Sequence, residues 1–129
     1  SKIGNIHIPK SIWKKMINAP RIEISANVDL RAKFLVKDYD YMCNDPTLIK
    51  PIIKGLKNRL SKKLLDEWAN LIDSKKWFDL TKSFLENHYD PSYSSNTIKN
   101  DRKVLKKITA SSLNNSDIEH IAKNILNKN

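Results

Sequence analysis

The segment "LENHYDPSY", residues 85–93, gathers side chains that could contact a nucleic acid. His88 offers an imidazole ring that can form hydrogen bonds, and Tyr89 and Tyr93 offer aromatic faces on which an unpaired base can stack. A histidine in the last turn of a helix also interacts well with its negative end, and an Asp-Pro step favours a chain reversal. The segment is therefore interpreted either as a base-contacting group or as a structural turn at a helix end.

A second candidate for contact with nucleic acid is a basic run that contains no acidic residue. It consists of Lys50, Lys54, Lys57, Arg59, Lys62 and Lys63. Such a run can follow a phosphate backbone, because each cation that meets a phosphate releases a counterion. It can equally be the solvated face of a helix, since charged positions point outward in any helix. The sequence leaves both interpretations open.

The sequence lacks the residue patterns that nucleotide-binding loops, metal sites and cysteine nucleophiles require. The two glycines, Gly4 and Gly55, begin neither a phosphate-binding loop nor a dinucleotide-binding turn. The histidines are scattered and show no zinc-ligand spacing, so no metal site is expected. Cys43 follows a pair of tyrosines at a predicted helix end and has no base near it in the sequence, so we expect a buried or half-buried structural thiol.

Composition limits the class of protein. The 129 residues suit one domain, and 24 Lys plus Arg against 14 Asp plus Glu give a net charge of +10, which favours a polyanionic partner. The apolar runs are far shorter than a membrane-spanning helix, and no signal peptide is evident. A single cysteine agrees with a reducing compartment. These features predict a soluble cytoplasmic protein without a membrane partner.

Helices are predicted for most of the chain. Their expected starts are Pro9, Asn27, the Asp45-Pro46 pair, Ser61 and Ser74. Pro51 either kinks the third of these helices or marks its proper beginning. The three tryptophans lie on apolar stripes of helical spacing and are expected in the core.

Strands are expected at one or two places only. Alternating apolar residues predict a strand from Arg21 to Ser25. Residues 104–109 fit either a strand or a helical turn. The remainder of 94–129 is predicted to be a polar loop and a C-terminal helix over 117–127, with Ser116 and Glu119 as its capping box.

The order of motifs along residues 3–93 resembles the tRNA 2-selenouridine synthase family. The resemblance depends on the ordered set and not on any single element. Its parts are Ile3-Gly4 with Pro9, Ala19-Pro20, "VDLRAKFLVKDYDY" with Arg31, Asp38 and Tyr39, Asp45-Pro46, the helices with Trp68 and Trp77, and "HYDPSY". Residues 94–129 match only loosely.

The resemblance implies an enzyme that replaces the sulfur of wobble 2-thiouridine in tRNA with selenium. Family members use selenophosphate, pass through a geranylated intermediate made from geranyl diphosphate, and carry a rhodanese-like domain followed by a P-loop domain. This sequence contains neither the rhodanese cysteine nor the Walker A loop, so the resemblance places both upstream of Ser1. The chain is then a tRNA-binding portion that is inactive alone and holds no cofactor.

The expected fold class is mainly α. We predict a multi-helix fragment, a single unit over 1–129, whose one or two short strands belong to the sheet of an α/β P-loop domain lacking its Walker A half. Arg31 resembles the lid-like arginine that P-loop enzymes bring to a phosphate, and Lys37 stands where many relatives have Arg. The expected nucleic-acid or phosphate contacts are Arg31, Lys37, Lys54, Lys57, Arg59, Lys62, His88, Tyr89 and Tyr93.

Two other functions remain compatible with the residues. One is a free-standing basic helical module that binds DNA or RNA and has no catalytic activity. The other is an interaction domain whose basic face meets an acidic protein. The presence of rhodanese and Walker A segments upstream in the same gene separates the enzyme from both.

Overall fold

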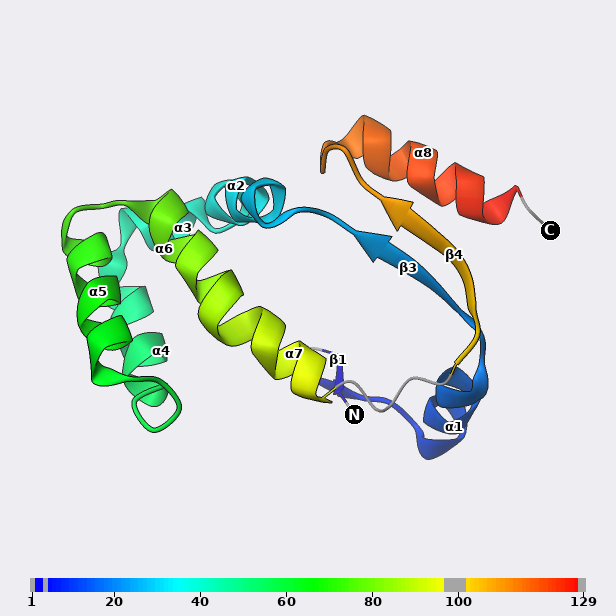
Figure 1. Cartoon of the computed structure of the whole chain (residues 1–129), viewed down its shortest axis with the longest axis horizontal. Coiled ribbons are helices and arrows are strands. Elements are labelled where there is room, and N and C mark those ends of the chain that lie inside the picture. The colour runs from blue at the N-terminus through cyan, green and yellow to red at the C-terminus, as the bar shows by residue number, and fades with distance from the viewer. Residues whose placement is uncertain (1, 4, 97–101, 128–129) are drawn as a thin grey trace.

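The computed structural model of the chain describes residues 2–3, 5–96 and 102–127, and most of them are helical (Figure 1). The mainly helical fold predicted from the sequence is confirmed. The helices are α1 (Lys10–Asn18), α2 (Val28–Asp38), α3 (Asp40–Asn44), α4 (Ile49–Gly55), α5 (Lys62–Asp73), α6 (Trp77–Phe84), α7 (Asp90–Asn96) and α8 (Asn115–Leu126). A 3-10 turn covers Pro46–Leu48 and a π-helical turn covers Leu85–Tyr89. None of the described helices is long and apolar enough to cross a bilayer.

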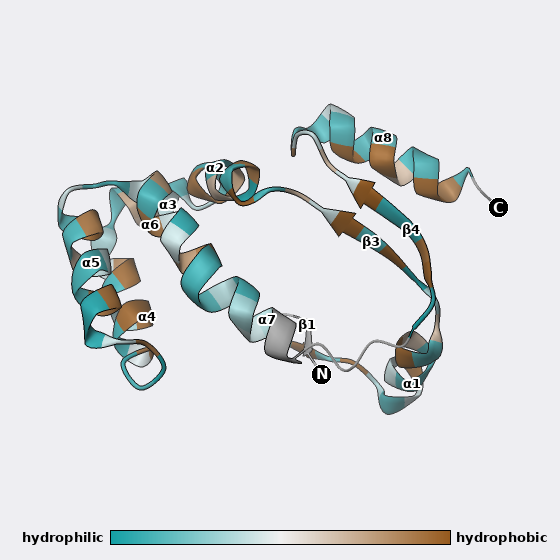
Figure 2. Cartoon of the chain, viewed as in Figure 1, coloured by the Kyte–Doolittle hydropathy of each residue, from teal (hydrophilic) through white to brown (hydrophobic). Residues whose placement is uncertain are grey.

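The described strands form two small sheets. β1 (Lys2–Ile3) and β2 (Ile6–His7) pair antiparallel, whereas β3 (Arg21–Ser25) and β4 (Val104–Thr109) pair parallel. The strand predicted at 21–25 is confirmed, and 104–109 is a strand because β3 supplies its hydrogen-bonding partners. Hydrophobic residues lie on both β3 and β4 (Figure 2).

The long connection between β3 and β4 contains α2 to α7 and forms a helical unit beside the sheet (Figure 1). Its core is built on Trp68, Ile72 and Leu80, which are all buried. Around them pack the half-buried side chains of Ile49, Ile53, Leu56, Leu60, Leu64, Leu71, Trp77 and Phe84. The core positions predicted for Trp68 and Trp77 are thus confirmed, while Trp13 is half-buried on α1.

Several predicted helix starts are confirmed by their caps. The Asn27 side chain accepts a hydrogen bond from the Leu30 N–H at 2.8 Å, and the Ser61 hydroxyl accepts one from the Leu64 N–H. Each cap satisfies an N–H group that the first helical turn leaves without a partner. The sequence rule for helix starts therefore holds at Asn27 and at Ser61.

Two predicted starts are wrong. Ser74 ends α5, because its hydroxyl donates to the Asn70 carbonyl oxygen at 2.6 Å, and α6 begins only at Trp77. The C-terminal helix begins at Asn115, because Asn114 accepts a hydrogen bond from the Asp117 N–H and thus replaces the predicted capping box. In both places the neighbouring polar residues made more than one cap possible.

The chain reversal that the sequence offered as one interpretation of "HYDP" is not formed. The chain continues from α6 through the π-helical turn into α7, and the Asp90 N–H bonds to the Leu85 carbonyl five residues back. Pro91 explains the wide turn, because in a regular α-helix its ring would press on the carbonyl four residues earlier. A π-helical turn inserts one residue and relieves that clash without ending the helix.

Candidate functional site

A cavity of about 510 Å³ lies within the helical unit. Its walls come from α2 to α6 and the π-helical turn, and Leu113, in the loop after β4, also lines it. The lining is mainly aliphatic and aromatic, because each helix turns its apolar stripe inward. A cavity of this size and character is typical of sites for small apolar ligands.

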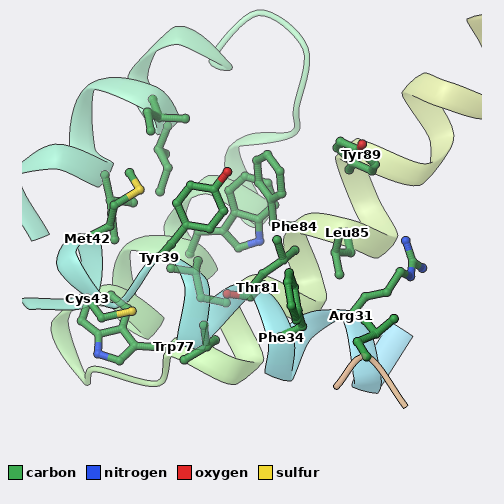
Figure 3. A pocket seen from close by; sticks show the side chains of 18 residues that line it. Arg31, Phe34, Tyr39, Met42, Cys43, Trp77, Thr81, Phe84, Leu85 and Tyr89 are labelled. Atoms are coloured by element: carbon green, nitrogen blue, oxygen red, sulfur yellow. The ribbon is translucent and has the colours of Figure 1, made fainter. Parts of the chain in front are cut away.

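The two ends of the cavity differ in chemistry. Arg31 and Tyr89 lie at one end, and Met42, Cys43 and Trp77 lie at the other (Figure 3). Among the described residues that line the cavity, Arg31 alone carries a formal charge. The cavity therefore combines an apolar interior with one cationic end.

Asp90 forms a bidentate ion pair with the Arg31 guanidinium. The Nη1 and Nη2 atoms of Arg31 each donate to one carboxylate oxygen of Asp90 at 2.8 Å. These hydrogen bonds raise the pKa of Arg31 and lower the pKa of Asp90. Within the described part of the chain, the buried Nε–H of Arg31 finds no hydrogen-bond acceptor. Arg31 thus keeps donor capacity after Asp90 is bound.

Tyr89 and Tyr93 form an aromatic pair next to this ion pair. Their rings stack with centroids 4.5 Å apart and planes 29° from parallel. A hydrogen bond with Tyr93, and then burial, raise the pKa of Tyr89, so the Tyr89 phenol is neutral at physiological pH. The Tyr93 side chain is 64% exposed, which leaves a ring edge or face open to a flat ligand.

His88 takes a different position from the tyrosines. Its ring packs edge-on against Phe84 at a centroid distance of 5.1 Å, and the side chain is half-buried. The cavity lining includes Tyr89 but not His88. This packing favours a structural role for His88, which was one of the two interpretations that the sequence left open.

The basic run forms a separate surface. Lys54 lies on α4, Lys57 and Arg59 follow it, and Lys62 begins α5; all four are exposed. None of them lines the cavity, and neither does the exposed Lys37 at the end of α2. The structure thus brings Arg31, Tyr89 and Tyr93 together and leaves the lysines apart from them.

Asp90 is the functional candidate that the sequence analysis missed. Its position before Pro91 indicated a turn, and its partner Arg31 lies 59 residues earlier in the chain. No local pattern links two residues at that separation. The only signal was the presence of both residues in the ordered motifs that carry the family resemblance.

Cys43 is half-buried, as predicted for a structural thiol. Burial first, and the nearby Asp40 carboxylate second, raise its pKa, so the thiol stays protonated at neutral pH and is a poor nucleophile. Within the described ranges, no cluster of three or more His, Cys, Asp or Glu side chains could hold a metal ion.

Comparison with known proteins adds no family assignment. No protein-family model, no curated protein and no solved structure matches the chain. The geometry of the cavity and the resemblance between sequence motifs are therefore the observations that bear on function.

Asp90 should make the stability of the protein depend on acid pH. Because its pKa is lowered in the folded state, the stabilisation is complete above about pH 4 and is lost as the pH falls through the lowered value. Both side chains are partly exposed, so Asp90→Asn should cost about 1 kcal/mol at pH 7 and much less at pH 2. Urea unfolding at both pH values measures this, and an equal loss at both would contradict it.

Proposed function

We propose that this chain is the tRNA-binding C-terminal portion of a tRNA 2-selenouridine synthase and that its cavity accepts the geranyl group of the reaction intermediate. The observation that carries the proposal is the apolar cavity with Arg31 at one end. A geranyl group is a branched hydrocarbon chain, and its transfer from water into an apolar cavity is favourable. The motif order in residues 3–93 supports the same family.

The polar end of the cavity suits the rest of such a substrate. The wobble base would lie against the exposed Tyr93 ring, with its geranyl group passing Tyr89 into the cavity. Arg31 would donate from its remaining N–H groups to a phosphate or to the base. In this arrangement the apolar geranyl chain contacts the apolar cavity lining, and the polar nucleotide contacts the polar end.

The small parallel sheet supports the proposal that the full protein contains a larger α/β domain. Parallel strands normally have both faces covered, because their connections cross over the sheet as helices. Here Ile24 on β3 is 55% exposed and Leu105 on β4 is 58% exposed. We expect further strands and helices, among them the Walker A segment, to complete this sheet in the full protein, with the rhodanese-like domain before it.

A free-standing basic nucleic-acid-binding module is the second candidate. It is favoured by the separation of the exposed lysines from the cavity, since a phosphate-binding surface needs no cavity. The two candidates differ in one respect that can be measured. Only the first gives the cavity a role in binding RNA.

The test compares two forms of one anticodon stem-loop, with 2-thiouridine or its S-geranyl derivative at the wobble position. Each buried CH₂ contributes about 0.8 kcal/mol, so two buried groups suffice for about tenfold tighter binding. We expect the geranylated RNA to bind this chain at least about tenfold more tightly, as measured by fluorescence anisotropy. Equal affinity for both RNAs would refute the proposed role of the cavity.

A variant that fills the cavity sharpens this test. Thr81 lines the cavity, and Thr81→Trp should remove the preference for the geranylated RNA while leaving the affinity for the 2-thiouridine RNA unchanged. Ser11→Trp is the matched control, because Ser11 is exposed on α1 and does not line the cavity. A preference lost in both variants would point to a general disturbance of the protein and not to the cavity.

A further inference from the structure

Two ion pairs join α2 to the long helix formed by α6, the π-helical turn and α7. Lys82 Nζ on α6 contacts an Asp29 oxygen at 2.8 Å, and Arg31 contacts Asp90 at the same distance. Only Arg31, of these four residues, lines the cavity. The pairs are therefore similar in length and in the helices they connect, but only one lies at the cavity.

The Arg31–Asp90 pair is coupled to the π-helical turn. Successive residues of an α-helix are rotated by about 100°, so the residue inserted by the π-turn rotates Asp90 by about that angle relative to a regular helix. The carboxylate meets Arg31 in the rotated position. Loss of the π-turn would therefore carry Asp90 away from Arg31, and loss of the pair would remove a contact that favours the π-turn.

The same turn carries part of the cavity wall. Leu85 and Tyr89 are its first and last residues, and both line the cavity. Figure 3 shows Tyr89 beside Arg31 at the cationic end. A change in the turn would move Tyr89 together with Asp90, because the two residues are adjacent in one helix.

We propose that the Arg31–Asp90 ion pair is a latch that holds the π-helical turn in place and keeps Tyr89 across the cationic end of the cavity. Breaking the pair frees the π-helical turn to shift and opens that end, although Pro91 still requires a wide turn there. The buried Nε–H of Arg31, which lacks an acceptor in the described chain, gives an entering ligand a donor through which to draw Arg31 away from Asp90. The latch concerns access to the cavity, whichever ligand fills it.

Cys43 provides a reporter for the latch. It is the single cysteine of the chain and lines the cavity at the end opposite Arg31 and Tyr89. Its reaction with N-ethylmaleimide, a neutral reagent, can be followed by mass spectrometry under conditions where the protein stays folded. Because Cys43 is only half-buried, the wild-type labelling rate is a baseline, and an increase above that rate reports additional access through the opened end of the cavity.

Removing the latch should speed labelling. Asp90→Ala and Arg31→Gln should each raise the rate about fivefold, which corresponds to about 1 kcal/mol for this partly exposed pair. Asp29→Ala is the matched control, because it breaks the other ion pair between α2 and the long helix without touching the cavity. Its labelling rate should stay within about twofold of the wild-type rate.

Two results would overturn the latch. One is wild-type labelling in both Asp90→Ala and Arg31→Gln, and the other is an equal acceleration in Asp29→Ala, which would indicate general destabilisation. Circular dichroism of each variant verifies that it is folded, and the two latch variants keep the test valid if one of them is not. Since no RNA is used, failure of the latch is distinguishable from failure of the proposed function.

Discussion

Changing Lys54, Lys57 and Lys62 together to Glu should weaken binding of unmodified tRNA at least about a hundredfold at 50 mM salt. Each lysine is exposed, and no acidic residue occurs between Lys50 and Lys63 to neutralise the surface. Each lost phosphate contact lowers the slope of log affinity against log salt by about 0.9, and the new carboxylates also repel the backbone. Titrations at several salt concentrations measure both the affinity and the slope.

A second basic surface of the chain supplies the control. Lys10, Lys14 and Lys15 are exposed on α1, so changing them to Glu alters the net charge by the same amount. If the basic run is the tRNA surface, this control should lose much less affinity than the first variant. Unaltered binding of the first variant at every salt concentration would mean that its lysines are only the solvated face of a helix.

The elements that the sequence predicted correctly depend on local signals. Alternation of Ile22 and Ile24 with polar residues is enough for β3, and Asn27 before an apolar stripe is enough for the start of α2. For 104–109 the local signal was ambiguous, and pairing with a strand about eighty residues earlier decided it. Local sequence patterns therefore predicted the elements that neighbouring residues stabilise, but not the strand that depends on a distant partner.

The helix through "HYDP" shows why one strong local signal misled the prediction. Asp90 before Pro91 favours a turn, but the Asp90 carboxylate is bound by Arg31 from another helix. That tertiary contact, together with the π-helical turn that accommodates the proline, favours helix continuation over reversal. The ion pair joins residues that lie 59 positions apart, so it could not be predicted from a window around the motif.

The candidate site was predicted in part. Arg31, Tyr89 and Tyr93 were selected from the sequence and lie near one another in the structure. The cavity was not predicted, because the apolar stripe of a helix looks the same in sequence whether it faces a filled core or an open space. Trp68 illustrates this, since it is both a core residue and part of the cavity wall.

Trp68→Ala should be the most destabilising single substitution among those considered, with a loss of about 3–5 kcal/mol. The indole is fully buried, packs against Phe84 at a ring-centroid distance of 5.5 Å, and donates from Nε1 to the Ser83 hydroxyl at 2.9 Å. Its removal would enlarge a space that is already hollow, so little collapse can offset the loss. Because native domains are stable by only about 5–15 kcal/mol, much of the helical unit's stability would disappear.

Matched variants separate the contributions of the indole. Trp68→Phe keeps a ring against Phe84 but leaves the Ser83 hydroxyl with only the Asn87 Nδ2 donor at 3.2 Å. Ser83→Ala removes the acceptor and keeps the indole, so it should cost about 1 kcal/mol. Trp13→Ala on the half-buried face of α1 should cost less than Trp68→Ala, as measured by urea unfolding followed by circular dichroism. If the order of the two alanine variants were reversed, the core of the protein would not be centred on Trp68. The cavity walls that depend on this core would then lack the rigidity that selective binding of an apolar ligand requires.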